Sequence, residues 1–230
     1  MVGCDYHLTG EHSMKVGKIV SNNKKEQTGV LTKEKYRSLL LDSGSLVVKI
    51  YKRGIIFDYP NRFPEGIFYE DNAISKSWML RAKHFEYIEE PMYYYYQHES
   101  STVHTISVKR CEDRMEAARI MIREAKEFGY FEEYREELEY SFTLLHYINT
   151  LFTYMVGVRP IRYGFIQKMG KEMREYFPDF QKNQYYLKRT NKEERKLISM
   201  QQKSTLYFIF YYKLLWGYRN LRKNLSGGKK

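Results

Sequence analysis

The sequence predicts an α/β fold over residues 1–107, followed by an all-helical region over residues 108–230. Two observations support this division. Before residue 107, short apolar runs are separated by Gly, Asn, Asp and Pro, which is typical of short strands and helices joined by turns. After residue 107, apolar side chains recur at the three- and four-residue spacing of long helices. Because 43% of the residues are hydrophobic and 17% aromatic, the chain can form a packed core.

In the first region, four short apolar runs predict strands or strand-like segments. They are VGC at 2–4, KVGKIV at 15–20, LVVKIY at 46–51 and GIIF at 54–57. Between them, the segment 32–41 predicts a short helix that is capped by Thr32 and ends before Gly44.

The segment 69–85 predicts a second helix, because Ile74, Trp78 and Ala82 recur every four residues. Its first turn contains Glu70 and Asp71. After it, FEYIEE and MYYYYQH, separated by a proline, predict two further extended segments.

In the second region, one helix is predicted over 109–127 and another over 131–156, which Pro160 ends. Thr190 and Glu193 have the spacing of a capping box that opens a further helix. Cys111 is in phase with the apolar face of the first of these helices, so it is expected to be a buried thiol. The buried face predicted for the second helix consists of Leu145, Ile148, Phe152 and Met155.

The net charge of +11 belongs to the C-terminal end of the chain. Residues 1–180 contain 26 basic and 26 acidic side chains, whereas the last fifty residues contain 13 basic and two acidic ones. This distribution is that of a neutral body with a basic end, and it does not favour a protein that binds nucleic acid over its whole surface.

The segment Phe63–Asn72, FPEGIFYEDN, is the candidate for chemistry. It places Glu65, Glu70 and Asp71 within seven residues, in a loop that leads into a helix. Acidic residues are common at helix starts for structural reasons alone. A carboxylate in this position also suits a general base.

The segments VVKIYKRGII, FPEGIFYEDNAIS and AKHFEYIEEPMYYYYQHESST, in that order, resemble the second half of the catalytic domain of family 2 glycosyltransferases. The resemblance covers residues 1–107 and implies a partial GT-A fold, the acceptor-side half of the catalytic domain. It implies inverting transfer of a sugar, of the hexosyltransferase type, from a nucleotide sugar to a glycan or lipid-linked acceptor in surface polysaccharide synthesis.

The resemblance also implies roles for individual residues. Asp71 matches the catalytic aspartate that takes the proton of the acceptor hydroxyl, and Glu70 matches its partner. Glu65 and Tyr69 would line the acceptor side. The remaining matches are Lys49, on a strand, His98, in the position of a basic or metal-binding residue near the donor diphosphate, and Ser101, which follows it.

The chain departs from the family pattern at the donor site. The family binds Mg²⁺ or Mn²⁺ through an Asp-x-Asp motif, and no two aspartates of this sequence are two residues apart. The alignment therefore implies that the nucleotide-binding half is missing, and that this chain alone is inactive. Asp5 and His7 are a conceivable substitute ligand pair, but their register matches the strand after the missing motif.

The basic C-terminal end predicts a peripheral membrane contact. Residues 206–216 are apolar except for Lys213 and are flanked by basic residues, which suits an anionic membrane surface for residues 204–230. The alternative is a helix packed on its neighbours. The expected location is the cytoplasm, with a peripheral position on the cytosolic face of the membrane. The sequence has no secretory signal pattern at its start.

Two functions therefore remain open from the sequence. One is a truncated family 2-like glycosyltransferase with Asp71 as its base. The other is a non-catalytic, membrane-associated interaction module or remnant built on the same half-fold.

Overall fold

The computed structural model describes residues 1–10, 17–60, 62–97 and 106–227. The chain forms two compact units, Met1–Val158 and Arg159–Lys230. The predicted α/β class is confirmed, because the first unit combines a mixed sheet with helices. The predicted boundary after residue 107 lies inside the first unit, which also includes the helices from 108 to 157.

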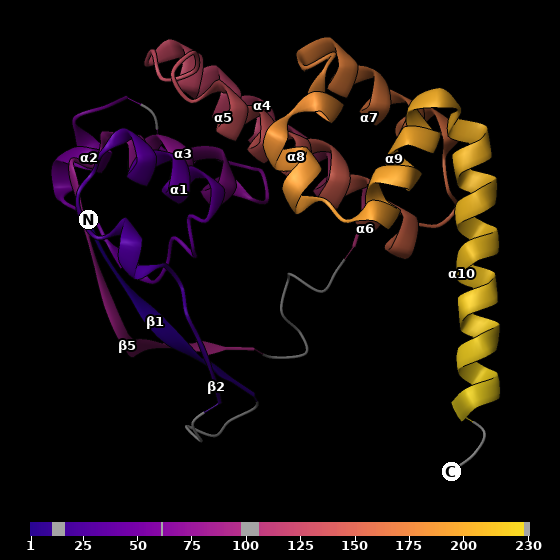
Figure 1. Ribbon diagram of the computed structural model, residues 1–230, viewed down its shortest axis with the longest axis horizontal. Coiled ribbons are helices and arrows are strands. Elements are labelled where there is room, and N and C mark those ends of the chain that lie inside the picture. The colour runs from indigo at the N-terminus through magenta and orange to yellow at the C-terminus, as the bar shows by residue number, and fades with distance from the viewer. Residues whose placement is uncertain (11–16, 61, 98–105, 228–230) are drawn as a thin grey trace. The chain divides into compact units, whose positions relative to one another are not determined.

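The sheet is organised around the parallel pair of β1 (Val2–Thr9) and β5 (His84–Tyr96). Along its other edge, β1 pairs antiparallel with β4 (Lys49–Ile50) near its start and with β2 (Lys18–Val20) near its end. β3 (Gly29–Val30) pairs antiparallel with the beginning of β5. Figure 1 shows β1 and β5 side by side. Their C-terminal halves extend beyond the helices toward β2.

The two extended segments predicted on either side of Pro91 are one strand, β5. Its register with β1 shifts between Cys4 and Tyr6, at the position where Pro91 stands opposite Asp5. A proline has no backbone N–H to donate to a neighbouring strand, so it is tolerated at such an irregularity. The strand continues on both sides of it.

Between β1 and β5, the chain forms the short 3-10 helix η1 (Lys25–Gln27) and three α-helices, α1 (Lys33–Leu41), α2 (Arg53–Phe57) and α3 (Glu70–Arg81). The cap predicted for α1 is confirmed: the Thr32 side chain accepts a hydrogen bond from the N–H of Lys35.

The strand predicted at 54–57 is wrong, because these residues form α2. A four-residue apolar run fits either a strand or one buried helical turn. Here the N–H of Ile55 donates to the carbonyl of Lys52 at 2.9 Å, and the turn buries Ile55 while Phe57 stays exposed.

The core of the α/β part lies between the sheet and the helices, and includes Leu39, Ile74, Trp78 and Phe85. Gly3 on β1 allows close packing at this point. A Cβ atom there would lie 3.1 Å from the Phe85 ring and 3.3 Å from the Lys49 side chain. A side chain at this position would therefore require the Phe85 ring or the Lys49 side chain to shift by a few tenths of an ångström.

The helix predicted at 109–127 is confirmed as α4 (Val108–Glu127), and Cys111 is buried on it as expected. The predicted helix at 131–156 is divided into α5 (Arg135–Phe142), the π-helical segment η3 (Thr143–Ile148) and α6 (Asn149–Gly157). A π-helical segment has an i→i+5 hydrogen-bond pattern and shifts the buried face.

This shift explains why only part of the predicted face is buried. Ile148 and Met155 are buried, whereas Leu145 and Phe152 are only partly buried. The side chains that replace them in the core are those of Phe142, His146, Tyr147, Leu151 and Tyr154.

The described part of the second unit is helical. It consists of α7 (Tyr163–Tyr176), the 3-10 helix η4 (Phe180–Lys182), α8 (Gln184–Arg189), α9 (Lys192–Lys203) and α10 (Thr205–Gly227). Within the ranges that the structure describes, no helix has both the length and the apolar character needed to cross a bilayer.

The cap predicted at Thr190 is wrong by one residue. α9 is capped by Asn191, whose side-chain oxygen accepts a hydrogen bond from the N–H of Glu194 at 2.8 Å. Thr190 instead ends α8, and its N–H donates to the carbonyl of Tyr186. Asn is as good an N-cap as Thr, so residue type alone does not show which of the neighbours Thr190 and Asn191 caps α9.

Candidate functional site

The candidate loop ends in an unusual backbone conformation directly before the acidic pair. Gly66 has φ 75°, which a glycine adopts without cost. Tyr69 has φ 67°, in the left-handed region that non-glycine residues rarely adopt, and it precedes Glu70 at the start of α3. Such residues persist only where surrounding contacts hold them, and they occur often at functional sites.

Helix α4 supplies contacts that hold the loop backbone. The carboxylate of Asp113 accepts a hydrogen bond from the N–H of Phe68 at 3.3 Å, although these residues are 45 positions apart. Lys109 forms an ion pair with Asp113 and donates to the carbonyl of Gly66 at 3.4 Å. The Asp113 carboxylate is buried, so its bond to the N–H of Phe68 is a charge-assisted contact at the edge of the core.

Arg114 holds Tyr69 by two contacts. Its Nη2 donates to the Tyr69 hydroxyl oxygen at 2.6 Å, and its guanidinium carbon lies 4.4 Å from the centre of the Tyr69 ring. Its Nη1 donates to the carbonyl of Asn149 and to the hydroxyl of Thr153, both on α6. The guanidinium therefore connects the start of α3 to α6.

The acidic residues lie on the solvent side of this assembly. Glu65 and Glu70 are exposed, and Asp71 is half-buried. Asp71 Oδ1 accepts hydrogen bonds from the N–H and the side-chain amide of Asn72, at 2.8 and 2.9 Å. The structure thus brings Tyr69, Glu70 and Asp71 together at one helix start, with Glu65 earlier in the same loop.

Two aromatic rings of the same loop, Phe63 and Phe68, remain accessible. Phe63 is 44% exposed and Phe68 is 43% exposed. The Phe63 ring packs edge-on against Trp78 at 5.2 Å, and the Arg110 guanidinium lies 4.3 Å from the centre of the Phe68 ring. Accessible rings that are fixed in this way are suited to stack on a flat apolar face of a ligand.

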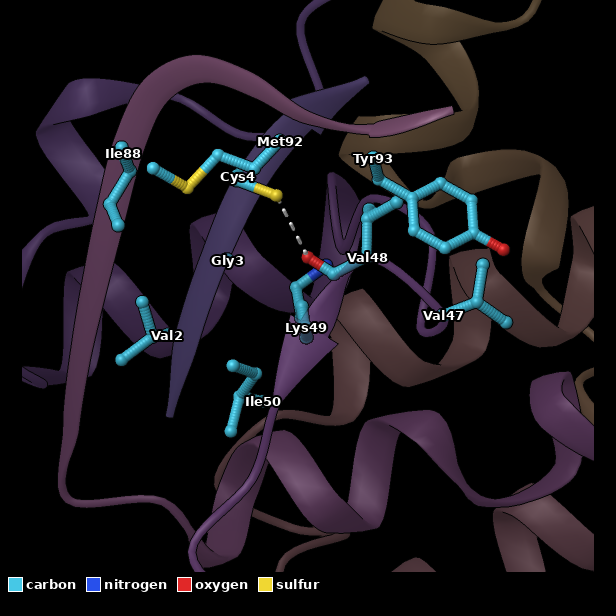
Figure 2. Close-up of a pocket in the computed structure, with 10 residues that line it drawn as sticks. All are labelled: Val2, Gly3, Cys4, Val47, Val48, Lys49, Ile50, Ile88, Met92 and Tyr93. Atoms are coloured by element: carbon cyan, nitrogen blue, oxygen red, sulfur yellow. Dashed lines mark hydrogen bonds between the residues drawn. The ribbon is translucent and has the colours of Figure 1, made fainter. Parts of the chain in front are cut away.

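Lys49 lies elsewhere. It lines a pocket of about 210 Å³ at the junction of β1, β4 and β5, among apolar side chains that include Val2, Ile50, Ile88 and Met92. Figure 2 shows these side chains around Cys4, whose thiol approaches the carbonyl of Val48. Of the other predicted site residues that the structure describes, which are Glu65, Tyr69, Glu70 and Asp71, none lines this pocket.

The Lys49 amine is buried, and it donates to the carbonyl of Ser45 at 2.8 Å. Burial, together with the ammonium of Lys76, lowers the pKa of Lys49 to about 7. Lys49 therefore lies apart from Glu70 and Asp71. Its lowered pKa means that the charged form of its amine is less favoured than in an exposed lysine.

Asp5 and His7 point to the buried side of β1. The Asp5 carboxylate accepts hydrogen bonds from the N–H of Asn22, at 2.9 Å, and from the hydroxyl of Tyr87. The His7 ring stacks on Tyr94 with ring centres 5.0 Å apart. These contacts engage both side chains in the packing of β1 against β5 and the crossover.

His98 and Ser101 lie outside the described residues. Within the described ranges, no group of three or more His, Cys, Asp and Glu side chains could hold a metal ion. The divalent metal that the resemblance implied stays a prediction, since its candidate ligand His98 is not among the described residues.

No family model matches the chain, and no curated protein or solved structure matches it either.

Asp113 and Arg114 are site residues that the sequence analysis missed. They lie beyond residue 107, in a helix assigned to the second region. A signal was present: Asp113, Ala117, Ile120 and Glu124 repeat at helical spacing, and all four are buried. This second buried face of α4 indicates a helix packed on two sides.

We expect Arg114→Met to loosen the loop without unfolding the protein. The variant loses the hydrogen bond and ring contact that hold Tyr69, so amide hydrogen exchange at residues 67–72 should accelerate about tenfold. The matched control is Arg123→Met, since Arg123 is exposed on the same helix. Equal exchange in the two variants would show that Arg114 does not hold the loop.

We also expect Lys49 to make stability depend on pH. Its ordinary pKa of 10.5 falls to about 7 on folding, so between these values the unfolded chain binds more protons. The free energy of unfolding of the wild type should then rise with pH relative to Lys49→Met, by up to about 1.4 kcal/mol per pH unit.

Urea denaturation at several pH values from about 7 to 9 measures this difference. Lys52→Met, which changes an exposed lysine, is the control and should follow the wild type. If Lys49→Met has the same pH dependence as the wild type, Lys49 is protonated equally in both states.

Proposed function

We propose that the first unit is the acceptor-binding part of a family 2-like glycosyltransferase with a partial GT-A fold, acting in surface polysaccharide synthesis. The observation that carries this proposal is the fixed presentation of the acidic pair. Glu70 and Asp71 follow a left-handed Tyr69, and α4 holds the preceding loop through Asp113 and Arg114. A general base needs this kind of preorganised position.

The proposed reaction is a single displacement. The Asp71 carboxylate takes the proton of an acceptor hydroxyl while that oxygen forms a bond to the anomeric carbon of the donor sugar. The bond from that carbon to the nucleotide diphosphate breaks, and the diphosphate leaves with the electron pair. The configuration at the anomeric carbon is inverted. Glu70 is the partner carboxylate beside the base.

The surroundings of the acidic pair support a carbohydrate acceptor. The exposed Phe63 and Phe68 rings provide apolar faces for the C–H side of a sugar ring, and exposed Glu65 provides an acceptor for its hydroxyls. Glu70 and Asp71 lie in the first turn of α3, where the partial positive charge of the helix N-terminus is located. The donor nucleotide sugar belongs to the half of the fold that the resemblance does not cover.

The second candidate is a non-catalytic binding module. It is favoured by the contacts of Asp71, whose Oδ1 already accepts two hydrogen bonds from Asn72. A carboxylate engaged in this way also serves to order the first turn of a helix.

A glycan array followed by saturation-transfer NMR tests the proposal. The chain should bind at least one oligosaccharide, and Asp71→Asn should weaken that binding about tenfold, because a charged hydrogen bond to the acceptor hydroxyl is lost. Asn at position 71 retains a side-chain oxygen that can accept from Asn72.

Glu112→Gln is the matched control, because it neutralises an exposed carboxylate on α4. It should bind like the wild type. Absence of binding to any glycan contradicts the proposal. Binding that Asp71→Asn leaves unchanged favours the non-catalytic module.

A further inference from the structure

Helix α10 has one face packed and the opposite face open. Phe208 and Tyr212 are buried against the other helices of the second unit, and α10 contacts both α9 and α7. On the opposite side, Leu206, Phe210 and Leu214 follow one another at four-residue intervals and are 70, 60 and 57% exposed. The sequence left open whether this segment packs on its neighbours or faces a membrane. In the structure, one face of α10 packs on its neighbours and the opposite face is exposed.

The open face is continuous and uncharged. Tyr207, Tyr218 and Leu221 extend it on the same side of the helix, and each is exposed. From Leu206 to Leu221 this apolar face is about 22 Å long, at about 1.5 Å per residue. Exposed apolar stripes of this size mark interaction surfaces.

The charge around this face is basic. Lys213 and Arg222 are exposed on α10 beside the stripe, and α10 contains no acidic residue. A hollow of about 300 Å³ between α9 and α10 is lined by Lys192, Lys196 and Glu193, and the Glu193 carboxylate pairs with Arg219 of α10. The whole second unit has 18 basic residues and five acidic ones, whereas the first unit has 21 and 23.

We propose that α10 lies flat in the interface of an anionic membrane, with Leu206, Phe210 and Leu214 inserted among the acyl chains. The surrounding lysines and arginines then face the lipid phosphates. Tyr207 and Tyr218 stand at the border between the two, where aromatic side chains with a polar end are favoured. This inference does not depend on the reaction proposed for Asp71.

The arrangement fits a bilayer surface better than nucleic acid or a protein groove. A nucleic-acid surface places cations among its exposed rings to reach the phosphates, whereas the centre of this stripe holds leucines and no cation. The excess of positive charge on both sides of an apolar stripe complements a surface that is apolar inside and anionic outside.

Flotation of the full chain with vesicles tests the proposal. Binding to phosphatidylcholine vesicles that contain about 30% phosphatidylglycerol should exceed binding to pure phosphatidylcholine at least about tenfold, and high salt should reduce it. Phe210→Ser with Leu214→Ser should reduce binding about tenfold. Leu187→Ser, which changes an exposed leucine on α8, should have no effect.

The charge contribution has its own matched pair. Lys213→Glu with Arg222→Glu should weaken binding to the anionic vesicles about tenfold, while Lys171→Glu with Lys182→Glu, of equal net charge, should weaken it far less. Lys171 and Lys182 are exposed outside α10.

Four results would overturn the proposal. One is competition by single-stranded RNA. The others are that the wild type fails to float with the anionic vesicles, that the α10 variants float equally to their controls, or that the chain forms a dimer without vesicles. In the last case light scattering would give twice 27.9 kDa, and Phe210→Ser with Leu214→Ser would restore the monomer without any vesicle binding. Competition by single-stranded RNA that abolishes flotation at low salt would assign the surface to nucleic acid instead.

Discussion

The parallel pairing of β1 with β5 is the constraint on which the first unit depends. Parallel strands need a long crossover connection, and here the crossover contributes α1 and α3, which cover the sheet. The pair is secured at Gly3, where Phe85 packs on bare backbone, and at Asp5, whose buried carboxylate joins Tyr87 on β5 to Asn22 in the crossover. A buried carboxylate that lost these donors would destabilise the sheet. The position of α3, and therefore of the acidic pair at its start, follows from this pairing.

The acidic pair then depends on a second set of contacts, from α4. A loop with a left-handed tyrosine would not keep one conformation by local preference, because that conformation is unfavourable for a side chain with a Cβ atom. Buried Asp113 fixes the backbone at Phe68. Arg114, also on α4, holds the Tyr69 ring and is itself held by the carbonyl of Asn149 on α6. The helical segment after residue 107 is thus part of the candidate site. The α10 surface is separate in both chemistry and location in the sequence.

Local signals in the sequence were sufficient for α1, α4 and the acidic segment, because a cap, a regular apolar face or a compact motif specifies each of them. They were insufficient where one run of residues suits two structures. The GIIF segment forms a helical turn, and Asn191 caps α9 in place of its neighbour Thr190. The contacts of Asp113 and Arg114 join residues about 45 positions apart, so no local pattern specifies them. The π-helical segment likewise depends on packing that residue type does not reveal.

The central claim is that α4 presents Glu70 and Asp71 to a carbohydrate acceptor. The most direct test is to titrate the isotope-labelled chain with an oligosaccharide that it binds on the glycan array, and to follow the titration by NMR. The account predicts chemical-shift changes concentrated at the amides of Gly66–Asn72 and at the Arg114 side chain. Shifts confined to the pocket around Val2, Ile50 and Met92 would contradict it.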